Sequence, residues 1–327
     1  MRSHGVDRNS RTGPNGWGAR LSAPGSPVCT PDWLALREPA DAAARDPDLA
    51  ALTAEGLGDE RPLVIRDLGC GSGSLGRWLA PQLPGPQRWV LHDRDAALLA
   101  RAEAGLPATA ADGTPVTARV EQGDLTDLDA AQLAGTSLVA ASALLDLLTA
   151  EEVDALADAC TAAGCPALLT LSVTGSVGFF PAEPLDSVFG AAFDAHQRRT
   201  VESESGSRRL LGPDAGAAAE HAFAKRGAVT EVRSSPWRLG PGWAGREWAE
   251  LTEEWLRGWI AAACAQQPDL AAFAADYLHR RISACVAGEL RVVVGHVDVL
   301  ALPGPPLQGP PLQGPPLQGP PLQGGTT

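Results

Sequence analysis

Short apolar segments alternate with helical segments between residues 62 and 175, and this alternation restricts the fold more than any other feature of the chain. Amphipathic stretches separate the apolar segments, for example the helix predicted over 95–105, which ends at Gly105. Strands that alternate with helices form a parallel sheet with crossover helices on both faces. The predicted strands are 62–69, 88–93, 116–124, 137–145 and 166–175.

The second half of the chain extends the same pattern with longer excursions. A helix is predicted over 213–227 and a strand over 228–235, followed by a helical stretch over 245–288. The last apolar segment, 289–302, must return to the sheet. We therefore predict a doubly wound α/β fold with a mostly parallel seven-stranded sheet. Helical cap insertions are expected at about 176–210 and 240–288.

The two ends of the chain lack this pattern. Residues 1–31 are rich in Gly, Pro, Ser and Asn without periodicity, which predicts a disordered leader. The tail 303–327 repeats GPPLQ four times, with two prolines in each repeat, which predicts an extended and disordered segment. Proline-rich ligands of small recognition domains have such sequences, but a neutral repeat expansion is the favoured interpretation. One domain is thus expected over 32–302.

Composition excludes several classes of protein. The net charge of −13 disfavours nucleic acid and other polyanionic partners. No apolar run is long enough for a membrane span and no signal peptide precedes the domain, so a cytoplasmic protein is expected. The six cysteines form no C-x-x-C pair, and neither a disulfide framework nor a metal site is predicted.

The loop after the first predicted strand reads DLGCGSGSLG, residues 67–76. Gly71, Gly73 and Gly76 fit the G-x-G-x-x-G pattern of dinucleotide sites, and ligands of such sheets lie beyond the carboxyl ends of the strands. Asp67, however, would oppose a pyrophosphate and favour a cationic ligand. S-adenosylmethionine carries a sulfonium and an ammonium group and fits this requirement. A nicotinamide-dependent oxidoreductase stays open as the alternative.

Three segments together resemble the motifs of the class I S-adenosylmethionine-dependent methyltransferases. DLGCGSGSLG resembles the first motif, VLHDRDAALLARA the second and VEQGDLTDL the third, and the resemblance extends from Trp33 to Leu302. It implies a Rossmann-like fold whose last strand, 289–302, is antiparallel. It also implies that Asp93 binds the ribose hydroxyls, Asp124 lies near the adenine amine and Leu125 packs on the ring. The predicted donor-binding residues are Asp67, Gly69, Cys70, Gly71, Gly73, Asp93, Arg94, Asp124, Leu125 and Ser142.

The fourth strand departs from the family pattern. The family often has Asp or Asn at the start or end of this strand, whereas this chain has Ser137 and Ser142. The Asn-Pro-Pro-aromatic motif of nucleic-acid amino-methylating enzymes is absent. A small-molecule acceptor, methylated on O, N or C, is therefore predicted. The remaining alternative is a methyltransferase-like binding module without catalysis, and the oligomeric state is not predicted.

The acceptor side is less constrained by the sequence, and each candidate residue keeps two interpretations. His196 shares a helical face with Phe189 and Phe193, as a general base or as a core histidine. Asp146 is a pocket acid or the start of a helix cap. Arg199 binds an anionic group of the acceptor or lies on a solvated face, and Trp237 lines the pocket or packs beneath the helical excursion.

Overall fold

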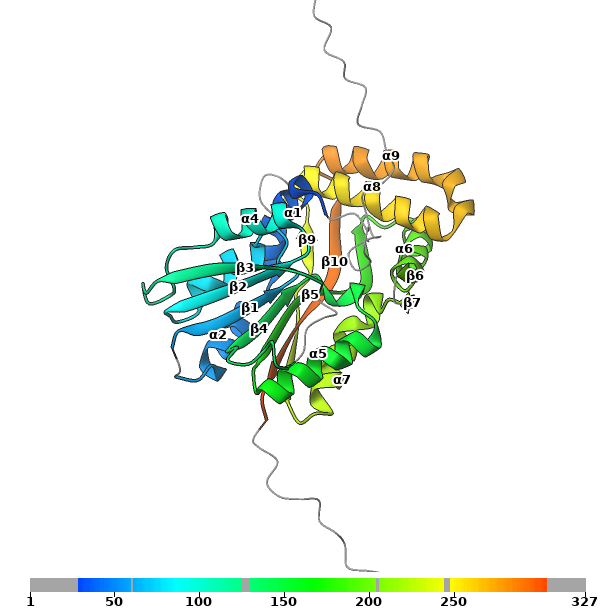
Figure 1. Cartoon of the computed structure of the whole chain (residues 1–327). Coiled ribbons are helices and arrows are strands. Elements are labelled where there is room, and N and C mark those ends of the chain that lie inside the picture. Colours follow the sequence, from blue (N-terminus) through cyan, green and yellow to red (C-terminus); the bar gives the residue numbers. More distant parts are fainter. Residues whose placement is uncertain (1–28, 60, 125–129, 204–205, 244–247, 305–327) are drawn as a thin grey trace, which may run out of the picture.

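The computed structural model describes residues 29–59, 61–124, 130–203, 206–243 and 248–304. One twisted sheet runs through the molecule (Figure 1). Its main path, in spatial order, is β3 (Val116–Gln122), β2 (Gln87–Asp93), β1 (Leu63–Leu68), β4 (Leu138–Ser142), β5 (Ala167–Phe180), β10 (Arg291–Leu302) and β8 (Val229–Ser234).

All strands of the main path run parallel to one another except the last strand in the chain, β10. β10 lies between β5 and β8 and is antiparallel to both. A short additional strand, β9 (Trp237–Leu239), pairs with the first half of β10 and makes the sheet eight-stranded. The predicted doubly wound, mostly parallel sheet with an antiparallel last strand is confirmed, with β9 as the addition.

Helices cover both faces of the sheet (Figure 1). On one face the helices pack on a core that contains the fully buried Ile65, Leu79 and Trp89. On the other face they enclose a second core around Leu169 and Phe223. The first group is α2 (Pro47–Gly56), α3 (Ser74–Leu79) and α4 (Ala96–Gly105), and the second is α5 (Ala150–Ala163) and α7 (Ala215–Ala224).

A third, aromatic core surrounds the first half of β10 and β9. Trp255 and Trp259 stack at 5.5 Å between ring centroids, and Phe189 stacks on Tyr277 at 4.8 Å. The predicted helical excursion forms two long helices at this end of the molecule (Figure 1). The helices of this layer are α1 (Pro31–Ala44), α6 (Pro184–Gln197), α8 (Trp248–Gln266) and α9 (Ala271–Val286).

The predicted cap at 176–210 is only partly helical. β5 continues to Phe180, because this extension pairs with β10, where Phe180 lies opposite Arg291. A hairpin that the sequence pattern did not reveal follows α6, formed by β6 (Thr200–Ser203) and β7 (Gly206–Arg209). The described residues also form short 3₁₀ helices, which are η1 (Ala80–Gln82), η3 (Leu145–Leu147), η4 (Gly212–Asp214) and η5 (Pro268–Leu270). The fourth strand ends at Ser142, and η3 occupies the end of the predicted segment 137–145.

The first helix begins one residue before the predicted domain boundary at residue 32. α1 starts at Pro31, and the side chain of Thr30 caps it by accepting a hydrogen bond of 3.3 Å from the backbone N–H of Trp33. The rest of the predicted leader and the GPPLQ repeats lie outside the described residues. Among the helices that are described, none combines the length and apolar character needed to cross a membrane.

A buried carboxylate fixes the middle of β10 to three other segments. Asp298 accepts hydrogen bonds from the backbone N–H groups of Leu171 (2.8 Å) and Asp46 (2.9 Å) and from the Ser235 hydroxyl (2.7 Å). Leu171 has a φ of 58°, so the carboxylate satisfies a backbone N–H at an irregular point of β5. The link to Asp46 fixes the junction between α1 and α2 on the sheet.

Candidate functional site

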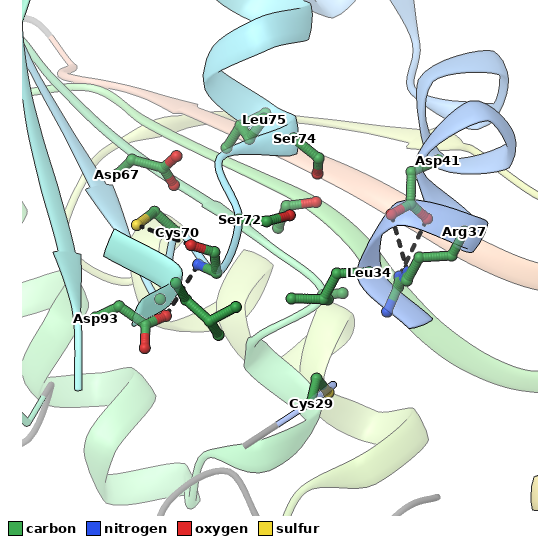
Figure 2. Close-up of a pocket in the computed structure, with 15 residues that line it drawn as sticks. Cys29, Leu34, Arg37, Asp41, Asp67, Cys70, Ser72, Ser74, Leu75 and Asp93 are labelled. Carbon is green, nitrogen blue, oxygen red and sulfur yellow. Dashed lines mark hydrogen bonds and ion pairs between the residues drawn. The ribbon is translucent and has the colours of Figure 1, made fainter. Parts of the chain in front are cut away.

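A cavity opens at the carboxyl ends of β1, β2 and β4. Figure 2 shows its two sides: Asp67, Cys70 and Asp93 come from the strand ends, and Leu34, Arg37 and Asp41 come from α1. The first turns of α1 therefore cover the glycine loop. The lining residues are Cys29, Leu34, Arg37, Asp41, Asp67, Gly69, Cys70, Gly71, Ser72, Ser74, Leu75, Asp93, Leu98, Ser142 and Ala143.

The loop after β1 needs glycine at the positions that turn the chain. Gly71 has a φ of 53°, and a Cβ atom there would lie 3.4 Å from Cδ1 of Leu34. Gly73 has a φ of 88°, and a Cβ atom there would lie 2.8 Å from Cα of Ala102 in α4. A side chain at Gly73 would thus clash with backbone as well as strain the left-handed conformation. The loop is shaped both by its own geometry and by the helix behind it.

Asp93 ends β2 and holds the glycine loop. Its Oδ2 accepts a hydrogen bond of 2.9 Å from the backbone N–H of Gly71, and its Oδ1 accepts one of 2.9 Å from Asp95. A carboxylate has about four acceptor positions, so Asp93 keeps capacity for two hydroxyl groups of a ligand. Asp95, by contrast, caps α4 through the N–H groups of Ala97 and Leu98, as the sequence predicted.

Asp67 is 0% exposed, and neither of its carboxylate oxygens has a hydrogen-bond partner among the described residues. Burial raises its pKa to about 7, although Arg45 and Arg77 act in the opposite direction. An unsatisfied buried carboxyl group costs free energy, and a cationic ligand would remove this cost. The residues at the loop therefore fit S-adenosylmethionine, and Asp67 would repel the pyrophosphate of a dinucleotide.

The structure brings together six of the ten predicted donor-binding residues on the cavity wall: Asp67, Gly69, Cys70, Gly71, Asp93 and Ser142. Gly73 shapes the loop from outside that wall. Arg94 and Asp124 lie half-buried after β2 and β3 and are not among the lining residues of the cavity. Leu125 lies outside the described residues.

Asp146 lies in η3, three residues beyond Ala143 of the cavity wall. Burial raises its pKa to about 6, while the charges of Arg37 and Arg199 lower it. Arg199 follows α6, where its Nη1 donates a hydrogen bond of 3.0 Å to the carbonyl oxygen of His196. The charges of two guanidinium groups from distant segments of the chain thus act on Asp146.

His196 and Trp237 are buried in the aromatic layer and do not line the cavity. His196 faces inward from α6 together with Phe189 and Ala192. Trp237 belongs to β9, and its Nε1 donates a hydrogen bond of 3.0 Å to Oδ1 of Asp41. The structure therefore places Trp237 behind the cavity wall, where it holds Asp41.

The residues that sequence reasoning missed are those of α1. Arg37, Asp41 and Arg45 follow one another at intervals of four residues, which places them on one helix face. Arg37 makes two hydrogen bonds to Asp41 (2.9 and 3.1 Å), and Arg45 contacts Ser142. The signal that could have revealed these residues is the charged stripe itself, which stands on an alanine-rich segment.

The sheet order, the antiparallel β10 and the acids at the ends of β1 and β2 define the Rossmann-like methyltransferase class of fold. Comparison with protein families agrees: a family model described as a methyltransferase domain matches residues 65–164, from β1 to the end of α5. The chain therefore contains a methyltransferase domain. The predicted enzyme class, an S-adenosylmethionine-dependent methyltransferase, is confirmed. No curated protein matches this chain in sequence.

Several solved structures resemble the fold at low identity. A cyclopropane synthase from Mycobacterium tuberculosis is 16% identical over 77% of this chain and 82% of its own, with a TM-score of 0.40. A magnesium protoporphyrin IX methyltransferase from Synechocystis PCC 6803 is 13% identical over 85% and 90%, with a TM-score of 0.41. Identities of this size leave the acceptor of this chain to be inferred from its own residues.

In the described part of the chain, no group of three or more His, Cys, Asp or Glu side chains is arranged to hold a metal ion.

Proposed function

We propose that this enzyme methylates an O, N or C atom of a small molecule that enters from the open side of the cavity. The observation that carries the proposal is the fully buried Asp67 beside the glycine loop, whose oxygens accept no hydrogen bond from any described residue, with Asp93 at the next strand end. These groups suit the ammonium and the ribose hydroxyls of S-adenosylmethionine. Asp124 and Leu125, after β3, would contact the adenine.

S-adenosylmethionine supplies a methyl group that is already activated by the sulfonium, so the protein has to align the acceptor and exclude water. The half-buried Leu34 and Cys29 cover the cavity from the α1 side. An acceptor atom that still carries a proton needs a base at this point.

We propose Asp146 as that base, ahead of His196. Asp146 adjoins the cavity wall and its pKa of about 6 leaves it ionised, yet basic, near neutral pH. His196 is buried and does not line the cavity. Arg199 is the candidate for binding an acidic group of the acceptor, since Arg37 is already held by Asp41 and lies over the rings of Trp33 and Trp237.

Other features support a small, non-polymeric acceptor in a reducing compartment. The net charge of −13 disfavours nucleic acid. All six cysteines are free thiols, which supports the proposed cytoplasmic location.

Calorimetric titration of the full chain with S-adenosylmethionine, S-adenosylhomocysteine and NAD tests the donor. We expect binding of the first two and none of NAD, and the reverse result would replace the methyltransferase by an oxidoreductase. A screen of a metabolite extract with methyl-labelled donor then tests the acceptor. Donor binding without labelling of any acceptor would favour the non-catalytic binding module.

A further inference from the structure

One face of the sheet carries exposed side chains where β9 and the extension of β5 pair with the first half of β10. Phe180 lies opposite Arg291, and both Gly178 and Arg238 lie opposite Val293, so these residues share one face. Phe180 is 56% exposed, and both arginines are exposed. The opposite face of the same strands packs against the aromatic core. The two faces of this part of the sheet therefore differ in chemistry and in burial.

Trp243 stands beside this exposed face, in the turn after β9. The guanidinium carbon of Arg291 lies 5.3 Å from the centroid of the Trp243 ring, and that of Arg238 lies 5.8 Å from it. Cations at such distances are attracted to an indole ring. The ring is nevertheless 41% exposed. Together with Phe180, these three residues form an aromatic–arginine patch.

The aromatic–arginine patch offers apolar rings and hydrogen-bond donors. Within the described residues, neither Arg238 nor Arg291 has a hydrogen bond or an ion pair, and each contacts only the Trp243 ring. A guanidinium group has five N–H donors and no acceptor. The ligand that fits such a surface brings apolar rings and carbonyl oxygens, few N–H groups and no positive charge.

Two long segments of this chain lie outside the described residues, and they differ in this chemistry. Residues 1–28 carry four arginines against one aspartate, and their charge opposes the two arginines of the patch. The GPPLQ repeats carry no charge, and two of every five residues are prolines, which lack an N–H group. Extended proline-rich segments leave their carbonyl oxygens unpaired and bind in grooves lined by aromatic side chains. The repeats, and not the leader, therefore match the patch.

The length of the tail determines which repeats reach the patch. β10 runs from Arg291, in the patch, to Leu302, which precedes the tail (Figure 1). The 12 residues of β10 span about 40 Å, because an antiparallel strand rises roughly 3.4 Å per residue. An extended proline-rich chain rises about 3.1 Å per residue, so two repeats cover about 30 Å and four cover about 60 Å. Residues 314–323, the third and fourth repeats, are thus the part of the tail that can return along β10 to the patch.

We propose that the third and fourth GPPLQ repeats, residues 314–323, bind the aromatic–arginine patch of the same chain. Proline rings of the repeats pack on the exposed rings of Phe180 and Trp243. Carbonyl oxygens of the repeats accept hydrogen bonds from Arg238 and Arg291. Because the tail is tethered, its effective concentration at the patch is on the order of 1 mM, and a weak contact is sufficient.

The bound tail would lie on a strand that also supports the donor cavity. β9 presents Arg238 to the patch, while the neighbouring Trp237 points to the opposite face and donates a hydrogen bond of 3.0 Å to Asp41. Asp41 lines the cavity. The inference itself does not depend on the identity of the methyl donor or of the acceptor.

Fluorine NMR of the full chain labelled with 5-fluorotryptophan tests the contact. The resonance of residue 243 is assigned by its absence in Trp243→Phe. A variant of the full chain has Ala in place of the prolines of the third and fourth repeats, which are Pro315, Pro316, Pro320 and Pro321. In this variant the resonance should shift, and its response to exchange of H₂O for D₂O should increase, because the indole loses its cover.

The matched control changes the same number of prolines in the first two repeats. These are Pro305, Pro306, Pro310 and Pro311. The first two repeats are too short to reach the patch, so the resonance of residue 243 should keep its wild-type position in this control.

A free peptide then measures the affinity of the patch. The peptide GPPLQGPPLQ is titrated into the variant that lacks prolines in the third and fourth repeats, and it should return the resonance toward the wild-type position. Phe180→Ala in this background should weaken peptide binding about 2- to 10-fold, the range of one aromatic contact. Phe273→Ala is the control, because Phe273 is similarly exposed (54%) but lies in the first turn of α9, outside the patch.

Several other results would overturn the proposal. An unchanged resonance in the variant of the third and fourth repeats, or an equal shift in the control variant, means that these repeats do not bind the patch. A wild-type position that changes on dilution of the protein assigns the contact to the tail of a second copy. A response to a tetraglutamate peptide without a response to GPPLQGPPLQ shows that the two arginines bind an acidic partner instead.

Discussion

The backbone N–H of Gly71 donates a hydrogen bond of 2.9 Å to Oδ2 of Asp93 and thereby joins the glycine loop after β1 to the end of β2. Asp93 therefore has two functions at once: it fixes the loop, and it presents its remaining acceptor positions to the cavity (Figure 2). A residue that both builds the site and binds the ligand cannot be replaced without loss of both contributions.

Replacing Asp93 by Ala should abolish detectable donor binding in calorimetry. Asn at this position retains one oxygen and should bind about 10- to 100-fold more weakly than the wild type, because one charged acceptor is lost. Asp95→Asn is the control, since the Asp95 side chain caps α4 by accepting from the N–H groups of Ala97 and Leu98. Unchanged donor affinity in Asp93→Ala would show that the second predicted motif is misassigned.

Donor affinity should depend on pH through Asp67. Its pKa in the free protein is about 7, so the carboxyl group is largely protonated at pH 6 and ionised at pH 8. An ammonium ligand requires the ionised form, and affinity should rise between about pH 6 and pH 8. Asp67→Asn should bind weakly at every pH. Donor affinity that falls over this interval would contradict the assignment.

The same group should affect the stability of the free protein with the opposite trend. The pKa of Asp67 is higher in the folded chain than the ordinary value of 3.8 expected after unfolding. The folded state then binds more protons between the two values, so the free energy of unfolding decreases as the pH rises from about 4 to 7. The slope from one proton is at most about 1.4 kcal/mol per pH unit. Urea unfolding of wild type and Asp67→Asn at several pH values measures it, and identical pH profiles would count against the buried carboxyl group.

Local patterns were sufficient to predict the seven strands on the main path of the sheet, the glycine loop and the acids at the strand ends. Asp67 and Asp93 follow apolar segments directly, and the carboxyl ends of neighbouring parallel strands meet at one edge of the sheet. Each of these inferences needs only the residues near the motif. The confirmed doubly wound sheet with its antiparallel last strand shows that this information fixes the frame of the site.

The rest of the site depends on contacts between distant segments. Trp237 binds Asp41 across 196 positions of the chain, and Arg45 reaches Ser142 across 97. The periodicity of the sequence does not indicate which residues this far apart are in contact. β9 was missed for a related reason: three residues form a strand only because β10 offers them a free edge. Contacts of this kind determine which of the predicted site residues line the cavity and which lie behind its wall.

The ion pair between Glu38 and Arg77 should control exchange of the donor. Nε and Nη2 of Arg77 each donate a hydrogen bond of 2.6 Å to Glu38, and Nη1 donates one of 2.6 Å to the carbonyl oxygen of Ser72. The pair thus holds α1 over the glycine loop. Glu38→Gln should raise the donor dissociation rate several-fold in stopped-flow experiments. Because both side chains are 27% exposed, its effect on unfolding should stay below about 1 kcal/mol.

The exposed pair of Glu253 and Arg257 on α8 provides the control for this measurement. Glu253→Gln should leave the donor dissociation rate unchanged. Equal dissociation rates in the wild type and Glu38→Gln would mean that α1 does not have to move for the donor to leave.

Asp298→Ala should be among the most destabilising single substitutions. It leaves the N–H groups of Leu171 and Asp46 and the Ser235 hydroxyl without their acceptor in a buried region. At about 1 to 3 kcal/mol for each unsatisfied donor, a loss of several kcal/mol is expected in urea unfolding. Ser235→Ala removes one donor together with its need for a partner and should cost about 1 kcal/mol. A loss in Asp298→Ala no larger than that in Ser235→Ala would show that water replaces the carboxylate.

Asp146 should appear in the pH dependence of methyl transfer once an acceptor is known. Its pKa of about 6 predicts that kcat rises through this value as the base becomes ionised and then levels off. Asp146→Asn should lower kcat by about 10²- to 10⁴-fold with little change in donor affinity, the range of general-base catalysis. His196→Gln, a change on the buried face of α6, should still show the rise of kcat near pH 6. If the rise of kcat near pH 6 persists in Asp146→Asn and disappears in His196→Gln, the histidine is the base and Asp146 is not.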